Sequence, residues 1–175
     1  MLALLLVWRC FSGESLMITQ ILISISQQTL ELRSTALRKT YPISTAKNGV
    51  GQQEGSFATP LGIHLVKDKF GYQLPTNTVF VGREPQVALF SPELEAENPD
   101  KDWILSRILW LSGCEPGLNR LGDVDTKTRY IYIHGTPDSQ PMSIPASHGC
   151  IRMRTYDVAE LFSHTPIYTQ VIIKE

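Results

Sequence analysis

The sequence Ser-His-Gly-Cys-Ile-Arg at residues 147–152 follows the pair His134-Gly135 in this 175-residue chain. Together these two segments are the strongest indication of its fold and chemistry. A cysteine thiol becomes a strong nucleophile near neutral pH only when a base lies beside it. His134 and His148 are both candidates for that base, and a neighbouring imidazole can hold Cys150 as a thiolate–imidazolium pair. The segment therefore predicts covalent acyl chemistry.

The residues on either side of the thiol suit this chemistry. Gly149 precedes Cys150 directly and permits a sharp turn that lets a substrate carbonyl approach the main chain closely. The amide of Cys150 and its neighbours would then stabilise an oxyanion. After the turn, Cys150 and Arg152 alternate with Ile151 and Met153, so an extended backbone places Arg152 on the cleft side.

The segment that carries the first histidine is predicted to be a strand. Residues 129–135 are rich in aromatic and β-branched side chains and end in glycine, which is typical of a strand that runs into a turn. Alternation places Tyr132 and His134 on one face and Ile133 on the other. His134 then ends a strand, where a rigid backbone can hold a catalytic group. Spacing alone leaves the choice between His134 and His148 open.

The two segments resemble the signature of the L,D-transpeptidase catalytic domain family. The matching positions are His-Gly-Thr at 134–136 and Ser-His-Gly-Cys-Ile-Arg at 147–152, and the His-to-Cys separation of 16 (150 − 134) is in the family's usual range. Residues 42–46, 59–62 and 110–117 are similar to further family segments. The similarity covers roughly residues 17–175, and two motifs at the right distance are far more specific than a lone Cys-His pair.

The resemblance assigns roles to individual residues. In the family the cysteine of the motif is the nucleophile, here Cys150, and the histidine of His-Gly is its base, here His134. The third member is typically a backbone carbonyl, here that of Gly135, which fixes the imidazole tautomer where no carboxylate does. The other motif residues are expected to shape the acyl site and the oxyanion hole: Ser147, His148, Gly149 and Arg152.

The reaction that the resemblance implies is peptide exchange on peptidoglycan stem peptides. Cys150 would attack the carbonyl at the L-centre of the third stem residue, expel a terminal D-amino acid and hold the stem as a thioester, while His134 moves the proton. An acceptor amine on another stem or on an outer-membrane lipoprotein would complete the transfer, whereas water would make the enzyme a carboxypeptidase or amidase. We expect no metal or organic cofactor, a monomer, and a place of action in the periplasm or cell envelope.

Two other classes of function compete with this interpretation. His134, His148 and Cys150 could bind zinc in a wall hydrolase, since zinc accepts imidazole and thiolate, but the chain has no His-Glu-x-x-His and no Cys-x-x-Cys. A nonenzymatic wall-binding module gives no reason for a nucleophile flanked by two imidazoles. Cys114 lies in a turn-like Gly-Cys-Glu-Pro-Gly segment and is expected to be structural or incidental.

The composition is that of an ordinary globular domain. With 42% hydrophobic residues and a net charge of −1, the chain suits a single domain with a sizeable core. It has no basic patch, which argues against nucleic acid as a partner. Three cysteines form an odd set without framework spacing, which argues against a disulfide scaffold.

The first 16 residues do not match the rest of the chain. Residues 2–8 are apolar, but this run is too short to span a bilayer and is followed by arginine rather than a small-residue cleavage site. We expect residues 1–16 to be an uncertain leader or a misassigned start. Residues 17–175 are expected to form one catalytic domain, with an export route that the sequence leaves open.

The remaining pattern predicts a mainly β fold with few short helices. Strands are expected at 21–25, 29–32, 63–66, 104–111 and 171–173, with a loop at 46–59. Prolines and acidic residues predict a long exposed excursion at 91–102, which could border the substrate cleft. One helix is expected after Thr155 as N-cap, burying Val158, Leu161 and Phe162. The resemblance implies that the strands form a two-sheet β-sandwich.

Overall fold

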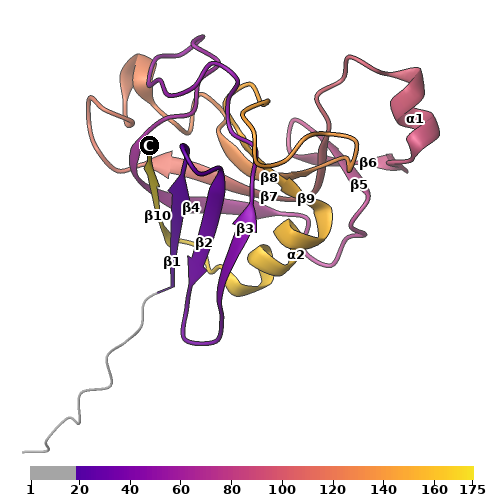
Figure 1. The fold of residues 1–175 in the computed structure, drawn as a ribbon, viewed down its shortest axis with the longest axis horizontal. Coiled ribbons are helices and arrows are strands. Elements are labelled where there is room, and N and C mark those ends of the chain that lie inside the picture. The colour runs from indigo at the N-terminus through magenta and orange to yellow at the C-terminus, as the bar shows by residue number, and fades with distance from the viewer. Residues whose placement is uncertain (1–18) are drawn as a thin grey trace, which may run out of the picture.

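Ten β-strands and two α-helices make up the part of the chain that the computed structural model describes, residues 19–175 (Figure 1). The mainly β class predicted from the sequence is therefore confirmed. In chain order the elements are β1 Gln20–Ser24, β2 Thr29–Arg33, β3 Arg38–Pro42, β4 Gly62–Phe70, β5 Thr78–Val81, β6 Glu84–Leu89, α1 Pro92–Glu97, β7 Ile104–Gly113, the 3-10 turn η1 Gly122–Val124, β8 Tyr132–Thr136, β9 Ile151–Arg154, α2 Thr155–His164 and β10 Gln170–Lys174.

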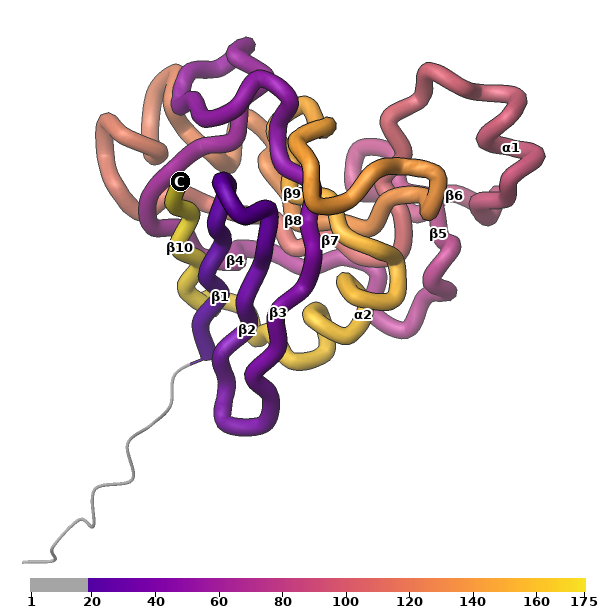
Figure 2. The backbone as a smooth tube through the Cα atoms, viewed as in Figure 1, coloured from indigo at the N-terminus to yellow at the C-terminus, as the bar shows by residue number. Residues whose placement is uncertain are grey.

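The sandwich expected from the resemblance takes the form of one curled, hydrogen-bonded sheet. Its order is β3-β2-β1-β10-β4-β7-β5-β6, and it branches at β7, which also pairs with β8. β8 in turn pairs with β9 in parallel. Figure 2 shows the result: β1, β2, β3 and β10 lie on one side of the molecule, β5, β6 and α1 on the other, and β7, β8 and β9 between them.

The main core lies inside this curl. It gathers buried side chains from β1, β2, β4, β7, β8, β9, β10 and α2 into one cluster. α2 contributes Val158, Leu161 and Phe162, the three residues predicted from helical spacing. Burial of these faces fixes the paired strands β8 and β9 against the body of the domain, which is where the sequence motifs lie.

The expected cap of α2 is wrong by one residue. The helix begins at Thr155, and its N-cap is Arg154, which makes no side-chain capping bond. Because β9 ends at Arg154 and passes directly into the helix, no separate capping residue fits between the two elements. The expected strand at 129–135 starts later than predicted: β8 begins at Tyr132, since Tyr130 has a φ of +56° and lies in a turn.

The segment between β4 and β7 contains the largest differences from the sequence-based expectation. The sequence does not predict the hairpin of β5 and β6 in this segment, nor β3, which precedes β4. The expected excursion at 91–102 contains the short helix α1, whose N-cap Ser91 accepts a hydrogen bond from the amide of Leu94 at 3.2 Å. Among residues 19–175 no helix is long and apolar enough to cross a membrane.

Candidate functional site

His134 is fixed in one orientation and one tautomer. Its side chain is buried on β8 with 2% of its surface exposed, and Nδ1 lies 2.8 Å from the carbonyl oxygen of Gly135. A carbonyl can only accept, so Nδ1 carries the proton and Nε2 is left as the basic nitrogen. Burial lowers the pKa of His134, and the hydrogen bond to Gly135 opposes that effect without cancelling it.

Gly135 is required by the close approach of β7. A Cβ at this position would lie 2.7 Å from the carbonyl oxygen of Leu105, which is closer than side-chain atoms approach a backbone oxygen. At this point β7 carries a bulge between Leu105 and Ile108, with Ser106 at a φ of +67°. Gly135 therefore allows β8 to pack closely against the bulge of β7. In this position the carbonyl of Gly135 points toward the imidazole of His134.

Cys150 lies on the same face of the β8–β9 pair as His134. Its Sγ accepts a hydrogen bond from the amide of Tyr132 at 3.3 Å and donates to the carbonyl of Tyr130 at 3.4 Å. Tyr132 and His134 are two residues apart on β8, so their side chains share a face at a spacing of about 6.6 Å. The thiol and the imidazole thus lie on the same side of the β8–β9 pair, near one strand end.

Desolvation disfavours the charged forms of both the thiol and the imidazole. Burial raises the pKa of Cys150 to about 12, and the amide of Tyr132 only partly offsets this. The pKa of His134 is lowered by burial at the same time. Both shifts oppose the formation of a thiolate–imidazolium pair, because desolvation penalises each of the two charges.

The turn before Cys150 is held by side-chain hydrogen bonds. Ser147 Oγ donates to the carbonyl of Cys150 at 2.6 Å and accepts from the amide of Gly149 at 3.3 Å. Thr59 Oγ1 donates to the carbonyl of Gly149 at 3.0 Å. Gly149 has a φ of +128°, and a Cβ there would lie 3.1 Å from Ile131 Cδ1, so glycine is the residue that fits.

His148 and Arg152 converge on a carboxylate that the sequence did not single out. His148 is exposed over 68% of its side chain and donates from Nδ1 to Asp102 Oδ2 at 2.9 Å. Arg152, with 5% of its side chain exposed, pairs through Nη2 with Asp102 Oδ1 at 2.7 Å. Burial favours the protonated form of Asp102, but the bond from His148 and the charge of Arg152 outweigh it and lower its pKa.

Asp102 lies at the end of the excursion that was expected to border the cleft. The excursion thus reaches His148 and Arg152, but nothing in the sequence marks Asp102 among its acidic neighbours. The structure therefore divides the predicted site residues into two groups around the turn. Those beside the thiol are His134, Gly135, Ser147 and Gly149, and those joined to Asp102 are His148 and Arg152.

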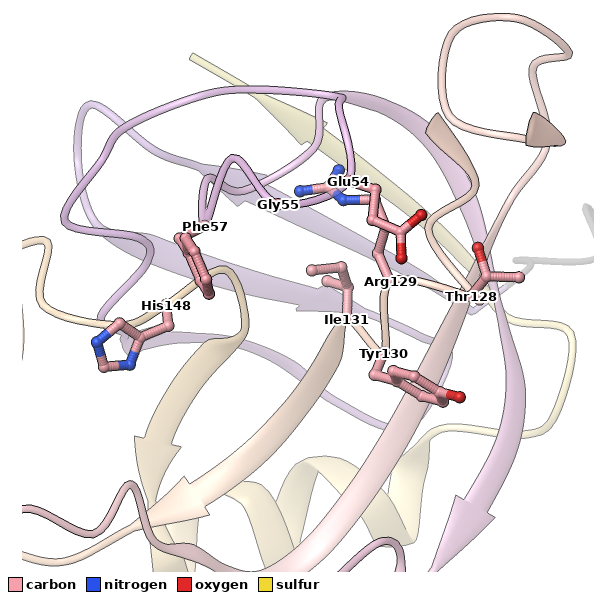
Figure 3. Close-up of a pocket in the computed structure, with 8 residues that line it drawn as sticks. All are labelled: Glu54, Gly55, Phe57, Thr128, Arg129, Tyr130, Ile131 and His148. Atoms are coloured by element: carbon pink, nitrogen blue, oxygen red, sulfur yellow. The ribbon is translucent and has the colours of Figure 1, made fainter. Parts of the chain in front are cut away.

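Two cavities adjoin the turn, and His148 lines both. The larger one, about 290 Å³, is lined by residues that include Phe57, Arg129 and Tyr130 (Figure 3). The smaller one, about 160 Å³, lies on the side of Asp102. Either is concave and mixed in polarity, as a peptide-binding site requires.

Arg129 joins the larger cavity to the 46–59 loop. Its Nη1 donates to the carbonyls of Gly51 and Gln52 at 3.1 and 2.8 Å. Its Nη2 donates to the carbonyl of Ala58 at 2.7 Å and to Ser56 Oγ at 3.3 Å. The guanidinium thus holds the loop that forms one wall of the cavity. In the part of the chain that the structure describes, no group of three or more His, Cys, Asp or Glu side chains is arranged to hold a metal ion.

Comparisons with known proteins point to one family. A sequence model of the L,D-transpeptidase catalytic domain matches residues 18–173. No curated protein matches the chain. Among solved structures, L,D-transpeptidase 3 of Mycobacterium tuberculosis in complex with a faropenem-derived adduct is 18% identical with a TM-score of 0.55, over 91% of this chain and 61% of that one.

Two further solved structures share the fold at similar distance. The L,D-transpeptidase of Mycobacterium smegmatis is 15% identical with a TM-score of 0.53, over 91% of this chain and 59% of that one. The L,D-transpeptidase of Xylanimonas cellulosilytica is 17% identical with a TM-score of 0.51, over 93% and 63%. This chain therefore spans less than two thirds of the length of these structures, and at such identities the likeness is one of fold.

Proposed function

Because this chain belongs to the L,D-transpeptidase catalytic domain family, we propose that it is an acyltransferase that acts on peptidoglycan stem peptides, with Cys150 as nucleophile and His134 as base. The observation that carries the proposal is the 2.8 Å bond from His134 Nδ1 to the carbonyl of Gly135. It leaves Nε2 basic, on the strand face that carries the thiol. An imidazole oriented in this way can take a proton from a thiol without a carboxylate partner.

The first half-reaction forms a thioester. As Cys150 Sγ attacks the carbonyl carbon at the L-centre of the third stem residue, its proton passes to His134 Nε2 and the carbonyl becomes an oxyanion. Collapse of that intermediate breaks the amide bond, and the leaving D-amino acid takes the proton from His134. Since desolvation disfavours both charges of the pair, we infer that the proton moves during attack rather than before it.

The amides of the turn are the natural donors to the oxyanion. Ser147 and Thr59 hold the carbonyls of Cys150 and Gly149, so the backbone around Gly149 and Cys150 is rigid before substrate arrives. Preorganised donors of this kind stabilise developing charge without reorganisation during the reaction. Asp102 has an indirect role, because it fixes His148 and Arg152 beside the turn.

The second half-reaction determines which product forms. An acceptor amine attacks the thioester carbonyl, gives its proton to His134 and releases the thiol of Cys150. An amine of a second stem gives a cross-link, and a lysine of an outer-membrane lipoprotein gives an anchored protein. Water gives a shortened stem, the carboxypeptidase outcome. We place this reaction in the cell envelope and expect a monomer to carry it out.

Product analysis tests the proposal. Pure protein is incubated with tetrapeptide-stem muropeptides, with and without a lysine-bearing acceptor peptide, and the products are identified by mass spectrometry. Cross-linked dimers or acceptor conjugates indicate transpeptidation, and tripeptides indicate carboxypeptidase action. Cys150→Ala is expected to abolish every product, whereas Cys114→Ala, which removes the other thiol of the described chain, should leave them. Neither product nor Cys150 adduct from the wild type would contradict the proposal.

A further inference from the structure

A cluster of one cation and three aromatic rings lies beside the thiol and has no role in the steps above. Arg83 Cζ is 4.5 Å from the ring centroid of Trp110 and 5.2 Å from that of Tyr130. These two rings are stacked, with centroids 6.1 Å apart and an interplanar angle of 22°. Arg83 Nη1 also donates to the hydroxyl of Tyr132 at 2.8 Å. The guanidinium is thereby held in a fixed orientation.

This cluster is connected directly to the reacting sulfur. Tyr130 and Tyr132 contact Arg83 with their side chains, and the same two residues contact Cys150 Sγ with their backbone carbonyl and amide. Tyr130 also lines the 290 Å³ cavity, where its ring is drawn at the edge (Figure 3). Tyr130 therefore links the guanidinium both to the sulfur and to the wall of this cavity.

The backbone conformation at Arg83 is unusual for an arginine. It lies at the tip of the β5–β6 hairpin, where Gly82 has a φ of +57° and Arg83 a φ of +74°. A two-residue turn with both φ values positive favours glycine or asparagine, and an arginine is rare there. The neighbours of Arg83 along the hairpin are mostly exposed, so the side chain is held by its contacts with Trp110, Tyr130 and Tyr132.

Most of the donors of Arg83 are not used within the protein. A guanidinium has five N–H donors in a planar fork. Within residues 19–175, its only hydrogen bond goes to Tyr132, and no ion pair involves it. Lys127, the other cation on the ring of Trp110, is by contrast paired with Asp68 at 3.6 Å. A half-buried cation with free, oriented donors matches a bidentate carboxylate.

We propose that Arg83, held on Trp110 and Tyr130, binds a carboxylate of the donor peptide and selects donors that carry it. The inference rests on the proposed function, since the donor stem supplies two such groups. One is the C-terminal carboxylate of the leaving D-amino acid, and the other is the side-chain carboxylate of a diaminopimelate-type third residue. Both lie close to the scissile bond, so either would reach a cation at the edge of the cavity.

The test measures binding and turnover with three matched tetrapeptide donors: the free acid, the C-terminal amide and the side-chain amide. Binding is measured by calorimetry on Cys150→Ala, with and without Arg83→Gln, and acylation is measured on the wild type and Arg83→Gln. We expect the free acid to be preferred over one of the amides by about 10-fold or more, as for charge-assisted hydrogen bonds. Arg83→Gln should remove this preference, and Arg83→Lys should restore only part of it because it lacks the planar fork.

Two control variants separate ligand binding from hairpin anchoring. Tyr132→Phe breaks the Arg83–Tyr132 bond but leaves the guanidinium on its two rings, so the acid preference should persist. Lys67→Gln removes a cation that lies 5.0 Å over the ring of Tyr168, away from the site, and should change nothing. An Arg83→Gln variant that weakens all three donors equally would overturn the proposal, as would equal binding of all three donors by Cys150→Ala. Acid-selective binding without any turnover would instead contradict the proposed function alone.

Discussion

Two segments meet at the thiol, residues 130–154 and residues 78–103, and they differ in almost every physical respect. The first is a short strand–turn–strand whose key groups, including His134, are buried and held by backbone hydrogen bonds. The second is a hairpin and excursion that is mostly exposed, yet it supplies Asp102 and Arg83. The comparison teaches that the reacting groups come from the first segment, while the second segment adds a carboxylate, Asp102, and a cation, Arg83, around them.

The largest expected effect separates the two histidines of the first segment. His134→Gln should lower kcat/KM for the donor by about 10²- to 10⁴-fold, the range for loss of a general base. His148→Gln should cost less than about 10-fold, because His148 is exposed and its Nδ1 is bonded to Asp102. Steady-state acylation of a tetrapeptide donor measures both. Equal losses of kcat/KM in the two variants would contradict the assignment of His134 as the base and of His148 as an exposed neighbour of the turn.

The next effect concerns the protonation state of the buried pair. Because burial raises the pKa of Cys150 to about 12, its thiolate fraction should rise about tenfold per pH unit up to that value. The rate of Cys150 alkylation by iodoacetamide in a Cys114→Ala background should therefore increase about 1000-fold from pH 7 to pH 10. The modified peptide is quantified by mass spectrometry. A rate that is already at a plateau near pH 7 would instead indicate a thiolate–imidazolium pair.

The third effect is on the pH dependence of the free energy of unfolding, to which the buried imidazole of His64 contributes. His64 is buried, hydrogen-bonded to Gly62 and Thr126, and burial lowers its pKa to about 4. The unfolded state, with a histidine pKa of about 6.5, binds the proton first, so stability is full above pH 6.5 and falls as the pH drops toward 4. The loss from this group is about 3 kcal/mol between pH 7 and pH 4.

Urea unfolding at these two pH values measures that loss. His64→Gln should be less stable than the wild type at pH 7 but should lose less on acidification. His134 contributes with the same sign because its pKa is lowered as well. A His64→Gln curve parallel to that of the wild type would contradict the buried neutral state.

The smallest effect compares two carboxylates, one paired with a buried guanidinium and the other with two exposed guanidinium groups. Asp102 pairs with the buried Arg152, whereas Glu31 pairs with Arg33 and Arg38, whose side chains are 45% and 72% exposed. Asp102→Asn should destabilise the fold by about 1–2 kcal/mol, since it leaves a buried cation without its charge partner. Glu31→Gln should cost less than about 1 kcal/mol. Thermal or urea unfolding measures both, and a larger loss for Glu31→Gln would reverse the assignment.

The first segment could be predicted from the sequence because its signals are local. Alternation of side chains, the glycine before the thiol and the separation of 16 residues all lie within 25 positions, and the carbonyl of Gly135 is where the family pattern implied it. The start of β8 was wrong because the positive φ of Tyr130 is set by the turn before it. Periodicity in the strand does not report such a conformation.

The other segment could not be predicted because its roles depend on long-range contacts. Asp102 meets His148 and Arg152 across 46 and 50 positions (148 − 102 and 152 − 102), and Arg83 meets Tyr132 across 49. A local pattern contains no information on such pairs. The start of helix α1 does have a local signal, because Ser91 is its N-cap and a proline lies in its first turn. The prolines of residues 91–102 also indicate an irregular excursion, and the prediction followed that second signal.

The central claim is that Cys150 becomes acylated with His134 as its base. The most direct test is the intact mass of the protein after rapid mixing with a tetrapeptide donor in the absence of acceptor. The account predicts one adduct, equal to the donor minus its terminal D-amino acid, located on Cys150, formed by the wild type and by His148→Gln, and strongly slowed in His134→Gln. An adduct on another residue, or equally fast acylation of His134→Gln, would contradict it.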